Sequence, residues 1–167
     1  MNHYKSIALL VLLWGIASGL GLKYSIPMMK SINDTDLMVL SATIPVMFFP
    51  GTLVFAWKRP IWWVVVVQLL ISLVAAVISG YFIDTVLRNL LLGVLSSLIL
   101  FVASRLAKNL KAQLILSFGL AFLFFTAANI YGHQLNASGL GVLAKVIVSM
   151  GLSFGVCLWG MMRWMRW

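Results

Sequence analysis

Six long apolar stretches, separated by short polar gaps, constrain this chain more than any other feature of its sequence. The residues are 63% hydrophobic and only 9% charged, whereas a soluble domain carries about a quarter charged residues. A helix needs about 20 mostly apolar residues to cross the hydrocarbon core of a bilayer. The 167 residues therefore hold six crossings only if the connections are short, and the pattern predicts a polytopic membrane protein.

The predicted crossings are helices. The backbone inside the hydrocarbon core must pair its polar groups internally, which only helices and closed barrels achieve. Barrel strands alternate apolar with polar residues, and runs such as residues 63–67 do not. We predict an all-α, six-helix transmembrane bundle that forms one transmembrane domain over residues 1–167. The expected spans are approximately residues 7–26, 37–57, 61–83, 87–104, 114–131 and 140–162.

The charges of the polar gaps indicate the orientation. If each stretch crosses once, the side that holds both termini carries Lys5, Lys58, Arg59, Arg105, Lys108, Lys111, Arg163 and Arg166. The opposite side carries Lys23, Lys30, Arg88 and Lys145 together with the acids Asp34, Asp36 and Asp84. Lys and Arg are enriched on the cytoplasmic side of membrane proteins. The count predicts that both termini lie in the cytoplasm. We expect the protein to lie in the inner (plasma) membrane of a bacterial cell.

The N-terminal region is basic and then apolar, which is also typical of a signal peptide. No clear cleavage site follows the small residues of 15–21. We therefore interpret the stretch from Ile7 onward as a retained first span.

The formal net charge of +9 excludes few classes of protein by itself. The distribution of the charge along the chain is more informative. The bases cluster at span ends, where they meet anionic lipid headgroups, and no aromatic and basic groove pattern indicates nucleic acid. Cys157 is the only cysteine, so it forms no intramolecular disulfide and no metal site. No nucleophile–base pair or phosphate loop is present. We expect no enzymatic activity, no catalytic residue, no cofactor and no metal.

Four charged residues near span ends are candidates for a substrate path. Asp84 precedes Arg88 by four residues, so the two can pair if that turn is helical. A carboxylate within the membrane is typically a proton or cation site, and the alternative is that Asp84 ends the third span at the outer interface. Lys23 and Lys145 either reach the interface or face a path.

Uncharged residues within the spans complete the candidate set. Pro45 and Pro50 lie in the second span, where they predict a helix break that marks a hinge, a cavity or only a packing kink. Trp14, Gln68 and Asn129 lie within other spans, and we expect them beside a pocket near the middle of the membrane.

Two glycine pairs have the spacing that allows close helix approach. Gly15 and Gly19 lie in the first span, and Gly151 and Gly155 lie in the last. We interpret both first as internal packing and second as a face for a homodimer or a different membrane subunit.

The first 60 residues resemble a repeat of the drug/metabolite transporter superfamily. The shared elements are Leu12-Leu-Trp-Gly15, Lys23 eight residues later, a short outer loop, an apolar second span and Lys58-Arg59-Pro60. The resemblance implies a helical bundle that exports small metabolites or drugs. Residues 61–167 lack the family's later pattern, including the usual glutamate near the end of the fourth span.

Two functions are consistent with the sequence, and we favour the first. The first is a small transporter, or the membrane subunit of a transport system, for a small or lipidic molecule. The second is a non-transporting assembly or regulatory subunit of a larger membrane complex, with membrane lipids and another chain as partners.

Overall fold

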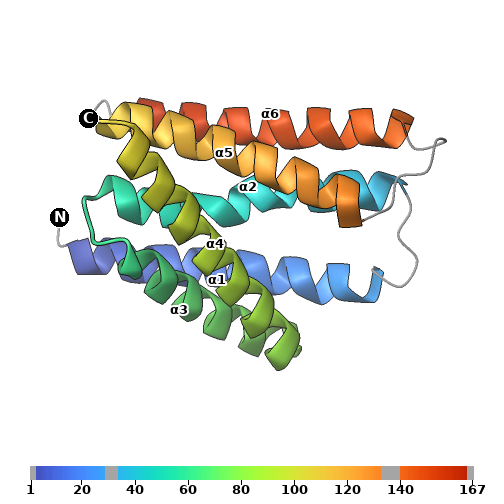
Figure 1. Cartoon of the computed structure of the whole chain (residues 1–167). Helices are drawn as coiled ribbons and strands as arrows, with labels where there is room; N and C mark the ends of the chain where they lie inside the picture. The colour runs from blue at the N-terminus through green and yellow to red at the C-terminus, as the bar shows by residue number, and fades with distance from the viewer. Residues whose placement is uncertain (1–2, 29–33, 133–139, 165–167) are drawn as a thin grey trace. The chain divides into compact units, whose positions relative to one another are not determined.

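The computed structural model describes residues 3–28, 34–132 and 140–164. Over these residues the chain forms six helices and no strand, which confirms the all-α prediction (Figure 1). The helices are α1 (His3–Met28), α2 (Asp34–Ala56), α3 (Trp62–Ser79), α4 (Phe82–Leu106), α5 (Leu110–Gly132) and α6 (Leu140–Trp164).

Five of the described helices are long and apolar enough to cross a membrane. The crossing stretches are Tyr4–Tyr24, Trp62–Ser79, Phe82–Leu106, Leu110–Ala128 and Ala144–Arg163. Helix α2 contributes a shorter apolar stretch, Thr43–Ala56. Large hydrophobic side chains such as Val77, Leu91 and Leu152 are exposed on these helices, which is compatible with lipid contact. These are the helices of a multi-pass membrane protein.

The boundary between the third and fourth spans differs from the prediction. Helix α3 ends at Ser79, not at residue 83, because Gly80 caps it with a left-handed φ of 77° and donates its N–H to the carbonyl of Ala76 at 3.1 Å. Glycine adopts that conformation without the steric cost of a Cβ. Asp84 consequently lies in the first turn of α4 and does not end the third span.

The predicted break at the two prolines of α2 does not interrupt the helix. Helix α2 is continuous from Asp34 to Ala56, and Pro45 and Pro50 are both buried within it. A proline deprives the carbonyl four residues earlier of its donor, which in a membrane helix is tolerated when neighbouring groups supply replacements. The prolines therefore mark a weakened ladder, not a helix end.

The chain divides into two compact units. Unit 1 comprises Met1–Lys30 and Met47–Phe101, and unit 2 comprises Ser31–Val46 and Val102–Trp167. The division falls between Val46 and Met47 in α2, within the segment bounded by the two prolines. Helices α2 and α4 each contribute to both units.

Unit 1 depends on close packing of α1 against α3, which lie side by side in Figure 1. A Cβ added to Gly15 would lie 2.6 Å from Cβ of Val74, and one added to Gly19 would lie 2.7 Å from Cβ of Ile78 and 2.8 Å from the carbonyl oxygen of Ala75. The first glycine pair is therefore an internal contact. It is covered by α3 and does not offer a face for a partner.

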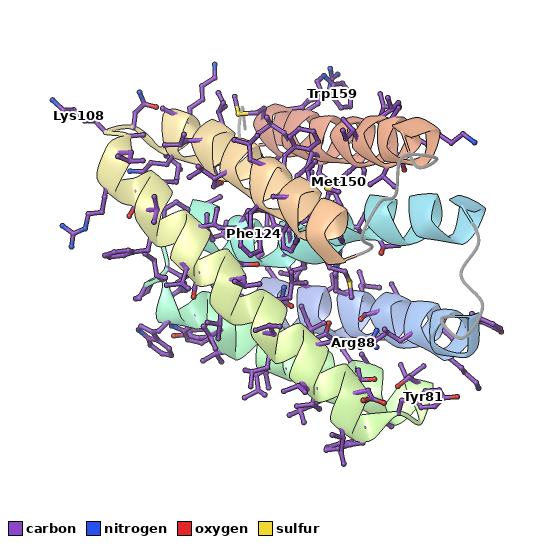
Figure 2. All side chains as sticks on the ribbon, turned by 45° about the vertical axis from the view of Figure 1, so that its right-hand side comes forward. Tyr81, Arg88, Lys108, Phe124, Met150 and Trp159 are labelled. Atoms are coloured by element: carbon purple, nitrogen blue, oxygen red, sulfur yellow. The ribbon has the colours of Figure 1, made fainter. Side chains whose placement is uncertain are left out.

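Unit 2 is built on aromatic packing between α5 and α6, which also lie side by side. The ring of Phe154 meets Phe118 and Phe122 edge-on at centroid distances of 5.9 and 6.1 Å. Thr126 donates its hydroxyl to the sulfur of Met150 at 3.9 Å, and Figure 2 labels Met150 on α6. Because the contacts advance along α5 as they recede along α6, the two helices are antiparallel.

We predict that Gly19→Ala destabilises the protein and that Gly21→Ala does not. The added methyl group at residue 19 meets the backbone of Ala75, which cannot rotate away, and overpacking of this kind costs about 1–3 kcal/mol. Gly21 is exposed, with no atom within 4 Å of an added Cβ. Thermal unfolding in detergent measures the difference, and equal stability of the two variants contradicts the packing.

Candidate functional site

Unit 1 contains a polar interior, a group of buried polar side chains that lies beside its buried apolar residues. Nine polar side chains are buried among the described residues, and all except Ser117 belong to unit 1. The eight are Ser18, Thr52, Gln68, Ser72, Ser79, Thr85, Asn89 and Ser96. Buried polar groups in a membrane protein are costly unless paired, so this concentration is the strongest candidate for a functional site.

Gln68 forms the centre of this polar interior. Its side chain is 2% exposed, and its Nε2 donates to the carbonyl oxygen of Met47 on α2 at 2.8 Å. Met47 lies between the two prolines, next to Val46, whose carbonyl loses its helical donor to Pro50. Gly93 of α4 allows the approach on the other side, because a Cβ there would lie 2.8 Å from Cβ of Gln68. The residue predicted beside a mid-membrane pocket thus ties α3 to α2 and packs against α4.

A second hydrogen-bonded group closes the turn between α3 and α4. The hydroxyls of Ser79 and Thr85 lie 3.0 Å apart, and the backbone N–H of Tyr81 donates to Ser79 Oγ at 3.2 Å. Both hydroxyl side chains are buried. This bond joins the end of α3 to the first turn of α4.

Two buried polar atoms of unit 1 have no hydrogen-bond partner among the described residues. They are Oγ of Ser18 on α1 and Nδ2 of Asn89 on α4. Most of the other buried hydroxyls donate within their own helix, as Ser72 does to Leu69 and Ser96 does to Leu92. The polar interior is therefore incompletely satisfied.

The four predicted charged candidates lie outside this interior. Asp84, Arg88, Lys23 and Lys145 are all exposed, and each lies within two turns of a helix end. Asp84 and Arg88 are one turn apart on α4, and Figure 2 labels Arg88 there. Among the side chains whose burial is described, Arg59 is half-buried and every other charged group is exposed. The polar interior is uncharged.

The remaining candidates are Trp14, Asn129 and the second glycine pair. Trp14 is half-buried in unit 1, where its ring stacks on Phe49 of α2 at 5.5 Å. The side chain of Asn129 lies outside the described residues. A Cβ added to Gly151 would lie 3.6 Å from the ring of Phe122, whereas Gly155 is exposed with open space around it.

Ser18, Thr52, Thr85 and Asn89 were missed by sequence reasoning. The signal for two of them was present, because Thr85, Asn89 and Ser96 recur at spacings of four and seven residues, which places them on one helix face. The expectation of a turn before residue 87 concealed this face. Ser18 lies in a run of small residues that gives no periodic signal.

Aromatic and basic residues gather at one end of unit 1. The guanidinium of Arg59 lies over the ring of Tyr4 at 5.4 Å, which brings the start of α1 to the α2–α3 connection. Trp62 and Trp63 stack at 5.2 Å at the start of α3. Such belts are typical of a membrane–water interface.

The described residues contain no group of three His, Cys, Asp or Glu side chains that could hold a metal ion. Comparison with known proteins adds no assignment: no protein-family model, no curated protein and no solved structure matches this chain.

We predict that Gln68→Leu destabilises the protein through loss of the bond to Met47. Hydrogen bonds between membrane helices contribute about 0.6 kcal/mol on average and up to about 1.7 kcal/mol. Ser72→Ala is the control, because its hydroxyl bonds only within α3. Chemical unfolding in mixed micelles measures both variants. A Gln68→Leu protein as stable as Ser72→Ala contradicts a structural role for this bond.

Proposed function

We propose that this protein is a small transporter, or the membrane subunit of a transport system, for a small or lipidic molecule. The observation that supports the proposal is the uncharged, incompletely satisfied polar interior of unit 1. A bundle built only to hold its helices together gains nothing from two unpaired buried donors, since each costs about 1–3 kcal/mol. A bundle that accepts a polar guest needs such groups.

The proposal includes six spans across a bacterial inner membrane, with both termini on the cytoplasmic side. Helix α2 has 23 residues, and at about 1.5 Å per residue this is long enough to cross the hydrocarbon core. The Lys and Arg count supports the orientation. Within unit 1, the contact between Arg59 and Tyr4 brings two of the predicted cytoplasmic segments to the same end.

The candidate path residues then have two roles. Gln68 and Trp14 lie in the interior of unit 1 and are proposed to contact the transported molecule. Lys23, Asp84 and Arg88 are exposed near predicted outer helix ends of unit 1, and we propose that they act at the outer mouth of the path. Lys145, which is exposed near the start of α6 in unit 2, is proposed to lie at the outer interface. No chemical conversion is proposed.

Transport is tested with the purified chain in liposomes and a panel of radiolabelled amino acids, polyols and amines together with fluorescent phospholipid analogues. We expect at least one probe to cross faster than in protein-free vesicles, and we expect Gln68→Leu to reduce that rate at least tenfold.

Gln113→Leu is the matched control for this experiment. Its Nε2 also donates to a backbone carbonyl, that of Ala107 at 2.9 Å, but near the start of α5 and outside unit 1. We expect this variant to keep the wild-type rate. A panel in which no probe crosses faster than in empty vesicles argues against transport.

A second candidate function is an assembly or regulatory subunit, and one observation favours it. Gly155 is exposed on α6, with no atom within 4 Å of an added Cβ, and it is flanked by the exposed Leu152, Val156 and Trp159. Small residues on an exposed face permit close approach of another membrane helix. Gly155 belongs to the second glycine pair, which lies in α6.

If α6 docks on another chain, Gly155→Leu should release that chain. Digitonin extraction followed by mass spectrometry of the purified complex detects the loss. Gly119→Leu on α5 is the control, because Gly119 is equally exposed and open. A wild-type protein that purifies as a single chain without a partner counts against this function.

A further inference from the structure

The two unpaired polar atoms of unit 1 belong to nearly fully buried side chains. Asn89 is 4% exposed and Ser18 is 5% exposed. Nδ2 of Asn89 is a hydrogen-bond donor, and the hydroxyl of Ser18 can donate as well. Ser18 comes from α1 and Asn89 comes from α4, and the neighbours of each residue show which part of unit 1 it faces.

The position of Ser18 on α1 directs it into the interior between α3 and α2. It follows Trp14 by four residues and Gly15 by three, so its side chain comes between their two directions. Trp14 stacks on Phe49 of α2, and Gly15 packs on Val74 of α3. Ser18 therefore faces the junction of α3 with the second half of α2.

The position of Asn89 on α4 directs it to the same junction. It precedes Gly93 by four residues and Ser96 by seven. Gly93 packs on Gln68 of α3, and Cβ of Ser96 lies 3.7 Å from an added Cβ on Gly51 of α2. The 3.6-residue repeat places Asn89 between these two directions.

Both residues also come level with the same stretch of α3. Gly15 and Gly19 lie beside residues 74–78, so Ser18 is level with that stretch. Asn89 lies midway between Thr85, which bonds to Ser79, and Gly93, which meets Gln68. The two positions therefore differ by less than about one helical turn along α3.

The wall that α3 presents at this level is made of small buried side chains: Ser72, Ala75, Ala76 and Ser79. Small side chains leave their neighbours short of contacts unless another molecule supplies them. The two unpaired atoms, Ser18 Oγ and Asn89 Nδ2, thus face small side chains of α3.

We propose that Ser18 and Asn89 form one binding site in unit 1 for an uncharged oxygen acceptor, either a water molecule or the hydroxyl or carbonyl oxygen of a neutral solute. The Nδ2 of Asn89 only donates, so it favours an oxygen lone pair and repels a cation, and the hydroxyl of Ser18 can donate to the same oxygen. An anion is disfavoured because no charged side chain among the described residues is buried with them. Neutral polar guests are the class that remains.

This inference deepens the proposed function by naming the chemistry of the guest. If the guest is a solute, the inference rests on the proposed function; if the guest is a water molecule, it does not. A bound water satisfies the same donors in a protein that transports nothing. Stability and contact at Ser18 and Asn89 are measured without flux, so a negative result there is distinct from a failure of transport.

The sign of the stability change tests occupancy. Gln68→Leu removes an amide that has a protein partner, and Asn89→Leu removes one that has none. If a guest pairs with Asn89, both variants should unfold at a temperature lower by about 2–4 °C. If the amide is unpaired, its removal relieves a desolvation cost and raises the unfolding temperature, which overturns the proposal.

The double variant tests whether the two residues share one guest. Ser18→Ala and Asn89→Leu should together lower the unfolding temperature by less than the sum of the single effects, because either change already releases the guest. Ser96→Ala, whose hydroxyl bonds within α4, should add independently to Asn89→Leu. Additive behaviour of Ser18→Ala overturns the shared site.

Nuclear magnetic resonance of the full-length chain in lipid identifies the source of the oxygen. Transfer from water protons to the Asn89 side-chain amide supports a bound water. Transfer only from added glycerol or acetamide, the two neutral probes, supports a solute. Absence of transfer from water and from both probes overturns the proposal even if Asn89→Leu is poorly folded.

Discussion

The close approach of α1 to α3 at Gly15 and Gly19 is the contact on which unit 1 depends. In a bilayer, lipid tails are as apolar as the side chains, so helices associate through close packing and hydrogen bonds. The distances at these glycines leave no room for a side chain on either residue. This contact also fixes the height of Ser18 against α3. The position of a polar side chain in the interior thus follows from two residues that have no side chain.

The two units solve the problem of helix association by different means. Unit 2 packs α5 on α6 through the rings of Phe118, Phe122 and Phe154. Unit 1 buries serines, threonines and amides, of which Gln68 is paired and Asn89 is not. The one buried polar side chain described in unit 2, Ser117, donates within its own helix. The unpaired buried amide of Asn89 is costly, which is why the proposed function is placed in unit 1.

Much of this architecture could be predicted from sequence, and the failures have physical reasons. Apolar length locates the helices, because the hydrocarbon core imposes it, and the spacing of Gly15 and Gly19 indicated internal packing. The end of α3 was misplaced because the apolar run continues past Gly80, and only its left-handed φ ends the helix. That error placed Thr85 outside a helix and hid the polar face that it shares with Asn89. An unpaired donor is a property of three-dimensional neighbours, so composition could not have found it.

The distribution of charge limits what the interior can select. The described charged groups lie near helix ends, where headgroups and water can solvate them. The middle of unit 1 holds Gln68, whose bond to Met47 reaches the α2 segment weakened by prolines. Under the proposed function, selection there relies on hydrogen-bond direction and fit, since no buried charge among the described residues supplies attraction over distance. Neutral guests lose less solvation free energy than ions when they leave water, and the uncharged donors of unit 1 suit neutral guests. The proposed chemistry of the interior and the low dielectric of the bilayer therefore favour the same class of guest.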